Sequence, residues 1–266
     1  VVLVSVDEAT LQAIGERPPF ARSHYADVVR RLVRAGVSVA ICLGTAAAAF
    51  GFDIQDTDDL HVLTPPGHQL RGSDGLVVHR RDGAPLTLVD GRPATTAAWT
   101  AVEVARSLRR PRALAVLDAA LRTTTCDRRQ LVAAARRQAG RRGIVVVREL
   151  IPLADPRAES PMESEARLVM LDGGLPRPEL QFEIGSWRVD FTWPDAGVVA
   201  EYESVEWHAG RLEMLRDRAR LAAIQELGWT VIPIVAADVR LTPERLVERI
   251  ATHLDRDTPA NRRKLA

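Results

Sequence analysis

The stretch LQFEIGSWRVDFTWPDAGVVAEYE, residues 180–203, decides the fold expected for the second half of the chain. Apolar and polar residues alternate along it, as they do in strands with one buried face. The pair Gly185-Ser186 is typical of a two-residue hairpin turn between two such strands. We therefore predict strands at 180–184 and 187–193, followed by a third strand at 198–203.

Helical patterns and one more strand surround the hairpin. The predicted elements are helices at 163–171, 211–227 and 243–254 and a buried strand at 229–235. The resulting order, α-β-β-β-α-β-α, indicates an α/β domain over residues 155–254, with a mixed sheet flanked by helices. Residues 255–266 are interpreted as a polar tail.

Acidic residues occur on neighbouring strands of this predicted sheet. Successive side chains of a strand face opposite ways, so Asp190 is expected to face away from Val189 and Phe191. If the second and third strands pair antiparallel, Asp190 and Glu201 come close together. Adjacent buried carboxylates repel each other unless a cation lies between them. Mg²⁺ binds a few carboxylate oxygens and keeps water molecules, which serve as the nucleophile at a phosphate.

Short motifs in this half match a known nuclease family in order and position. They are SPME (160–163), RVDF (188–191), VAEYE (199–203), WH (207–208) and DRAR (217–220). Through them the chain resembles the very-short-patch-repair-like endonuclease domain, a branch of the P-D-(D/E)-x-K nucleases. The resemblance implies a restriction-endonuclease-like fold, DNA as the partner, and Mg²⁺ or Mn²⁺ as the cofactor.

The same resemblance implies roles for individual residues. It makes Asp190 the principal metal ligand, Glu201 the second ligand, and Glu163 the acid of the first helix. His208 takes the place of a histidine that polarises water or protonates the leaving oxygen. The accessory candidates are Gln181, Arg188 and Glu203.

Two departures from the family pattern favour an alternative. Glu203-Ser204 stands where the family has Asp-Gly, and the lysine of the wider superfamily is absent, since Lys264 is the only lysine. Catalysis would then depend on His208 or Arg188, or would be lost. The alternative hypothesis is a nuclease fold that binds DNA or protein as a regulator of the antitoxin type.

Each candidate residue also has a purely structural interpretation. Asp190 can belong to a surface ion pair of little energy, and Glu163 can be an acid favoured by the start of its helix. His208 can be an ordinary interface histidine. Asp217 and Arg220, spaced i,i+3 on a helix, are interpreted as a surface pair.

The first half of the chain carries two further resemblances. Residues 1–43, with VVLVSVDEATL and ARSHYADVVRRL, resemble the start of CHASE-type sensor domains. Residues 44–127 resemble the C-terminal domain of AbiEi-type antitoxins, through TAAAAFGF, LHVLTPP, VVHR and DGRPATTAAWTAVEVA in that order. The second resemblance implies an α/β antitoxin-like domain with a toxin or defence-system partner. Sensing is disfavoured, because we find no membrane helix in the sequence.

Arginine is concentrated between Arg106 and Arg142. This segment holds eleven arginines against Asp118 and Asp127, and we interpret residues 128–154 as a basic helical linker. A basic segment fits contact with a polyanion. It equally fits a solvated helical face, so both interpretations stay open.

Bulk composition indicates a globular protein, with 46% hydrophobic and 27% charged residues and a net charge of +1. The most apolar stretch, residues 37–52, is shorter than the ~20 residues of a membrane helix. Two cysteines exclude a disulfide framework and a four-cysteine zinc site. We therefore expect a cytoplasmic protein that does not associate with a membrane.

Overall fold

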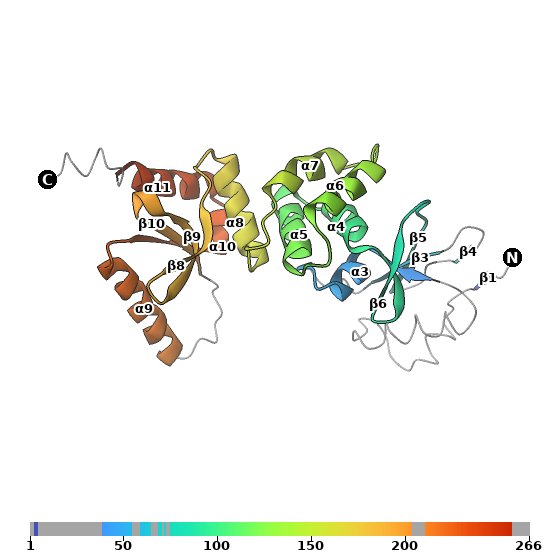
Figure 1. The fold of residues 1–266 in the computed structure, drawn as a ribbon, viewed down its shortest axis with the longest axis horizontal. Helices are drawn as coiled ribbons and strands as arrows, with labels where there is room; N and C mark the ends of the chain where they lie inside the picture. The colour runs from blue at the N-terminus through green and yellow to red at the C-terminus, as the bar shows by residue number, and fades with distance from the viewer. Residues whose placement is uncertain are drawn as a thin grey trace. The chain divides into compact units, whose positions relative to one another are not determined.

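The computed structural model describes residues 3–4, 39–54, 59–64, 69–70, 72, 75–203 and 211–256. Most of the CHASE-like segment, His208 and residues 257–266 lie outside these ranges. The chain divides into two compact units, Val1–Pro156 (the N-terminal unit) and Arg157–Ala266 (the C-terminal unit). Each unit has a mixed sheet with helices, so the predicted α/β class is confirmed (Figure 1). No helix within the described ranges combines the length and apolarity needed to cross a membrane.

The N-terminal unit is built on a five-stranded sheet with the order β5-β3-β2-β7-β6. Its strands are β2 (Ala40–Ile41), β3 (Leu60–Leu63), β5 (Leu76–His79), β6 (Leu86–Val89) and β7 (Arg92–Thr95). Strand β3 pairs parallel with β5, and β2 pairs parallel with β7. The pairs β2–β3 and β6–β7 are antiparallel. A separate parallel pair joins β1 (Leu3–Val4) to β4 (Gln69–Leu70).

Helices form the second layer of this unit. They are α3 (Leu43–Ala49), α4 (Ala97–Ala105), α5 (Arg110–Arg122), α6 (Arg128–Arg137), α7 (Ile144–Leu150) and the 3-10 turn η1 (Ile151–Leu153). Figure 1 shows α4 to α7 grouped together beside the sheet. Every residue of α4 is buried, which is the behaviour of a helix at the centre of a bundle. Its many Ala and Val side chains are small enough to let neighbouring elements approach from several sides.

Residues 128–154, predicted as a basic helical linker, are helical, but these helices pack within the N-terminal unit. Asp127 caps α6 and forms a capping box with Gln130. The apolar side of α6 and α7 is buried through Leu131, Ala134, Ala135, Ile144, Val147 and Leu150. The Arg128 guanidinium donates to the backbone oxygens of Ile151 and Ala154. The high arginine content therefore marks the outer side of packed helices rather than a linker.

Strands β6 and β7 form a hairpin that the sequence analysis missed. Its turn residues, Asp90 and Gly91, both have positive φ, at 50° and 74°, as a type I′ turn requires. Asp-Gly is a preferred sequence for such a turn, so a local signal was present. The strand itself was hidden because Leu86, Thr87 and Leu88 are all exposed and give no alternation of burial.

The C-terminal unit contains a four-stranded sheet with the order β11-β10-β9-β8. Its strands are β8 (Glu179–Ile184), β9 (Trp187–Trp193), β10 (Val198–Tyr202) and β11 (Thr230–Ile234). Its helices are α8 (Pro161–Asp172), the 3-10 turn η2 (Pro194–Ala196), α9 (Arg211–Glu226), α10 (Ala236–Arg240) and α11 (Pro243–Arg256). The three strands β8, β9 and β10 pair antiparallel, and β10 pairs parallel with β11. This is the predicted order of elements with α10 added.

Helices cover both faces of this sheet. Figure 1 shows α8 and α11 on one side and α9 on the other. Phe191 packs in the core that includes Met170 of α8, whereas Val189 packs in the core that includes Ile224 of α9. The prediction that Val189 and Phe191 share one face is therefore wrong. The regular alternation of side chains along β9 is interrupted between these two residues, at Asp190.

The start of α7 fits closely against the residue that follows α4. Gly143 has φ +81°, and a Cβ on it would lie 2.0 Å from the backbone oxygen of Arg106. Gly140 has φ +77°, and a Cβ there would meet nothing within 4 Å. We expect Gly140→Ala to cost about 1 kcal/mol for left-handed backbone alone. Gly143→Ala should destabilise the N-terminal unit much more, because the clash is added.

Thermal unfolding followed by circular dichroism compares the two variants. A much lower Tm for Gly143→Ala than for Gly140→Ala is the expected result. Equal shifts in Tm would contradict the close approach of Gly143 to Arg106.

Candidate metal centre

Glu163 lies in the first turn of α8, where Ser160 is the N-cap and accepts a hydrogen bond from the Glu163 backbone N–H. Glu163 is only 7% exposed. Its Oε2 accepts from the backbone N–H of Glu159 at 2.8 Å and from Nε2 of Gln181 at 3.1 Å. The first bond fits an acid that stabilises a helix start. The second bond ties the same carboxylate to the sheet.

The alternation of side chains along β8 is interrupted at Gln181. Leu180 packs with the core on the α8 side and Phe182 with the core on the α9 side. Gln181 between them has φ +53°, a conformation that costs a non-glycine residue on the order of 1 kcal/mol or more and that occurs often at functional sites. Its side chain hydrogen-bonds to both Glu163 and Asp190. The distortion therefore places one amide between two candidate acids.

Asp190 and Glu201 are neighbours across the β9–β10 pair. The antiparallel register places Ala200 opposite Phe191, so the next step along the strands brings Glu201 beside Asp190. Oδ2 of Asp190 accepts from the backbone N–H of Tyr202 at 2.9 Å. Glu201 is 7% exposed. The structure thus brings together the three acids that the sequence singled out, with Gln181 among them.

Arg220 of α9 is a member of this centre that sequence reasoning missed. Its guanidinium donates to both oxygens of Glu201, at 2.5 and 2.9 Å, and to the backbone oxygen of Arg188 at 2.7 Å. Two-pronged pairing of this kind is the strongest geometry between arginine and a carboxylate. We had interpreted Arg220 as one half of a surface pair, whereas it is a counter-ion of the acidic centre.

Burial is the main influence on the charges of these acids. It raises the pKa of Glu163, of Asp190 and of Glu201 above their ordinary values. The hydrogen bonds and positive charge of Arg220 lower the pKa of Glu201 and its charge lowers that of Asp190, while the repulsion between these two carboxylates raises the pKa of Glu201. The centre therefore sets one arginine against three acids whose charged forms are disfavoured by burial.

Two of the remaining candidates are exposed beside the centre, where the charge of Glu203 helps to raise the pKa of Glu201, and the third lies outside the described residues. Arg188 is exposed and pairs with Glu159 at 2.8 Å, so its side chain does not join the acids. Glu203 is exposed, and its backbone N–H donates to Ile234. His208 falls in residues 204–210, which the structure does not describe. Its predicted role as a proton donor stays a prediction.

The donor chemistry of the centre fits Mg²⁺, which prefers carboxylate oxygens and often needs only one or two of them besides water. Among the described residues, no three His, Cys, Asp or Glu side chains are arranged to hold a metal ion. A site for Mg²⁺ would therefore use Asp190 and Glu201 as ligands. Glu163 would act through Gln181, which hydrogen-bonds to both Glu163 and Asp190. Arg220 would have to withdraw from at least one oxygen of Glu201 for a cation to bind there.

Comparison with known proteins adds to this geometry. Residues 39–153 match the AbiEi antitoxin C-terminal domain family. The match confirms the antitoxin-like prediction for 44–127 and extends it over helices α6 and α7. Two uncharacterised proteins of Mycobacterium tuberculosis, from strains CDC 1551 / Oshkosh and H37Rv, are each 62% identical over 220 residues, covering 81% of both chains. The chain belongs to the same family as these mycobacterial proteins. No solved structure matches it.

Removal of Arg220 should destabilise the C-terminal unit, because it leaves the nearly buried Glu201 without its counter-ion. Breaking a fully buried pair costs ~3–5 kcal/mol, and exposure of about a quarter of Arg220 reduces our expectation to about 2 kcal/mol. Arg218 is exposed on the same helix and serves as the matched control. Urea unfolding of Arg220→Gln and Arg218→Gln measures the difference. Equal stability of the two variants would contradict the pairing.

The raised pKa values predict a pH dependence. Acids whose pKa is higher when folded contribute stability below their ordinary values, 3.8 for Asp and 4.5 for Glu, and lose it as pH rises through the folded pKa values. We expect Asp190→Asn to lose less stability than the wild type between pH 4.5 and 7. Thermal melts across this range test the point, and parallel curves for the two proteins would refute it.

Proposed function

We propose that the C-terminal unit is a metal-dependent DNA endonuclease, within a protein that acts in a bacterial toxin–antitoxin or abortive-infection system. The antitoxin domain at 39–153 supports the setting, and a toxin or other defence-system component is the partner that this setting implies. The single observation that supports the activity is that Glu163 of α8 approaches Asp190 and Glu201, which lie on the two central strands of the sheet.

In this proposal Asp190 and Glu201 would hold Mg²⁺ or Mn²⁺. A bound ion would supply charge stabilisation and activate water for attack on a phosphodiester. Tyr202 orients Asp190 through its backbone N–H, and Gln181 positions Asp190 and Glu163 relative to each other. Arg220, once it leaves an oxygen of Glu201, has donors available for a negatively charged phosphate oxygen.

A second candidate function is regulation by an inactive nuclease fold. The observation that favours it is the two-pronged bond of Arg220 to Glu201, which neutralises a proposed ligand within the protein itself. The Glu203-Ser204 departure and the missing superfamily lysine point the same way. Such a protein would bind DNA or a partner protein without cleaving DNA.

A cleavage assay separates the two candidates. Plasmid DNA is incubated with the full chain and Mg²⁺ or Mn²⁺, with EDTA as the blank. Wild type should nick or linearise the plasmid, and Asp190→Asn should lower the rate by about a hundredfold or more, since the main ligand is lost. Asp195→Asn, at an exposed acid of the same unit, should cleave like wild type. Cleavage unchanged in Asp190→Asn would remove the proposed site, and no cleavage by any variant would favour the regulator.

A further inference from the structure

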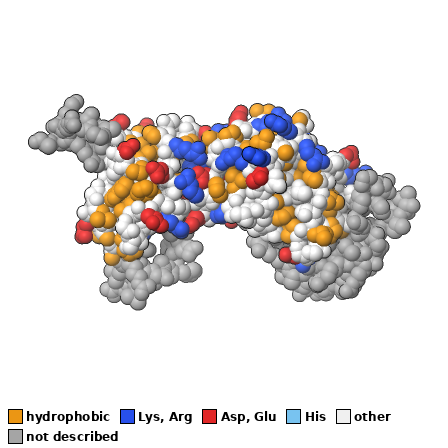
Figure 2. All heavy atoms as spheres, viewed as in Figure 1, with side chains coloured by type: hydrophobic (Ala, Val, Ile, Leu, Met, Phe, Trp, Pro, Cys, Tyr) orange, Lys and Arg blue, Asp and Glu red, His pale blue; other side chains and the backbone are white. Residues whose placement is uncertain are grey.

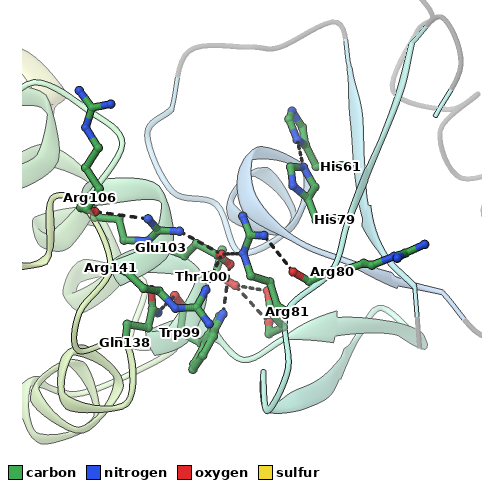
Figure 3. A network of polar contacts seen from close by, with 12 residues as sticks. His61, His79, Arg80, Arg81, Trp99, Thr100, Glu103, Arg106, Gln138 and Arg141 are labelled. Carbon is green, nitrogen blue, oxygen red and sulfur yellow. Dashed lines mark hydrogen bonds and ion pairs between the residues drawn. The ribbon is translucent and has the colours of Figure 1, made fainter. Parts of the chain in front are cut away.

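The N-terminal unit contains a second polar centre, around Glu103 of α4. Glu103 is 1% exposed, and its Oε1 accepts from Nε of Arg81 at 2.5 Å. The same oxygen lies 3.4 Å from a terminal nitrogen of Arg106 and 3.8 Å from one of Arg141. Its Oε2 accepts from the indole nitrogen of Trp99 at 3.1 Å. Figure 3 shows these side chains gathered around the carboxylate.

The ring of Trp99 makes cation–π contacts with two arginines. The guanidinium carbons of Arg137 and Arg141 lie 5.7 and 5.4 Å from the ring centroid, within the range of cation–π attraction. Arg137 also donates to the backbone oxygen of Gly83 at 2.8 Å. We call Arg81, Arg106, Arg137 and Arg141 the arginine cluster. Its members come from distant parts of the N-terminal unit and are fixed by one carboxylate and one indole.

The arginine cluster carries more positive charge and more donors than its described partners satisfy. Three guanidinium groups surround the Glu103 carboxylate and that of Arg137 lies over Trp99, so the four arginines exceed this one carboxylate by three positive charges. Nε of Arg106 is buried and has no hydrogen-bond partner among the described residues. Arg141 reaches Glu103 only at 3.8 Å, which is longer than a hydrogen bond.

Solvent reaches this charge. The side chains of Arg81 and Arg141 are 25% and 28% exposed, and Arg137 is exposed. Figure 2 shows Arg side chains gathered over helices α6 and α7. Helix α6 and the loop after it supply Arg137 and Arg141. Like charges held this close repel one another, and a polyanion relieves the repulsion. Fixed guanidinium groups also lose little conformational entropy when they bind.

We propose that the arginine cluster binds the phosphodiester backbone of nucleic acid, with Glu103 and Trp99 acting as positioning residues. Planar guanidinium forks match phosphate oxygens in two-pronged geometry, and contacts to several phosphates need several such groups fixed together. The site needs no metal and uses residues of the N-terminal unit alone, so this proposal does not depend on the proposed nuclease activity. Sequence composition left nucleic-acid contact by residues 106–142 open, and this arrangement favours it.

Fluorescence anisotropy in EDTA tests the proposal, because cleavage is then blocked and the result is separate from the fate of the nuclease. The full chain is titrated into a short labelled DNA duplex, an RNA duplex of equal length, and labelled polyglutamate. We expect binding to at least one nucleic acid, weakening as salt rises. Binding to polyglutamate alone would assign the cluster to an acidic protein and overturn the proposal, as would binding to none.

The variants Arg141→Gln and Arg245→Gln form a matched pair, because each removes one charge and Arg245 is exposed on α11 of the C-terminal unit. Arg141→Gln should weaken nucleic-acid binding by about tenfold and reduce the slope of log affinity against log salt by about one. Adding Arg137→Gln should reduce that slope by about one more. Arg245→Gln should leave both measures unchanged. Equal behaviour of Arg141→Gln and Arg245→Gln would refute the site.

A folding control keeps the test interpretable. Thermal unfolding of each variant should remain within a few degrees of wild type, since neither Arg137 nor Arg141 is buried. If Arg141→Gln fails to fold, Arg141→Lys replaces it, because lysine keeps the charge but lacks the planar fork. Arg141→Lys should weaken binding while preserving the salt slope, and wild-type affinity in this variant would contradict a two-pronged phosphate contact.

Discussion

The guanidinium of Arg220 connects helix α9 to strands β9 and β10 of the C-terminal unit. Arg220 comes from α9 and bonds to Glu201 of β10 and to the backbone of β9 at Arg188. The carboxylate that it neutralises lies beside Asp190, and Gln181 links Asp190 to the α8 side of the sheet. Helices on both faces of the sheet are therefore connected through one small polar centre. In the proposed function, the centre cleaves DNA only if a cation replaces Arg220 as the partner of Glu201.

Much of the C-terminal unit follows from alternation and turn chemistry. The two residues at 185–186 set the β8–β9 register, and the short connection at 194–197 sets the β9–β10 register, so the approach of Asp190 to Glu201 could be predicted. The left-handed backbone of Gln181 could not, because nothing in its residue type requires positive φ. The partner of Arg220 could not either, since it lies 19 residues away and depends on how α9 docks on the sheet.

The N-terminal unit was harder to predict because its signals conflict. Arginines on α6 and α7 suggested a solvated linker, although Leu131, Ile144 and Leu150 provide the apolar stripe that packs these helices. Local patterns cannot show that Glu103, in an apolar helix, contacts one arginine just after that helix and two more from the segments that follow β5 and α6. A lone buried acid in such a helix is nevertheless a sequence signal, since a carboxylate is rarely buried without partners.

Anomalous diffraction from crystals soaked with Mn²⁺ tests the central claim about the C-terminal unit most directly, because Mn²⁺ replaces Mg²⁺ at oxygen sites and scatters anomalously. The account predicts one strong peak at the carboxylates of Asp190 and Glu201, with Arg220 moved away from at least one oxygen of Glu201. Crystals that show no peak, with both bonds from Arg220 to Glu201 intact at saturating Mn²⁺, would contradict a metal centre at this place.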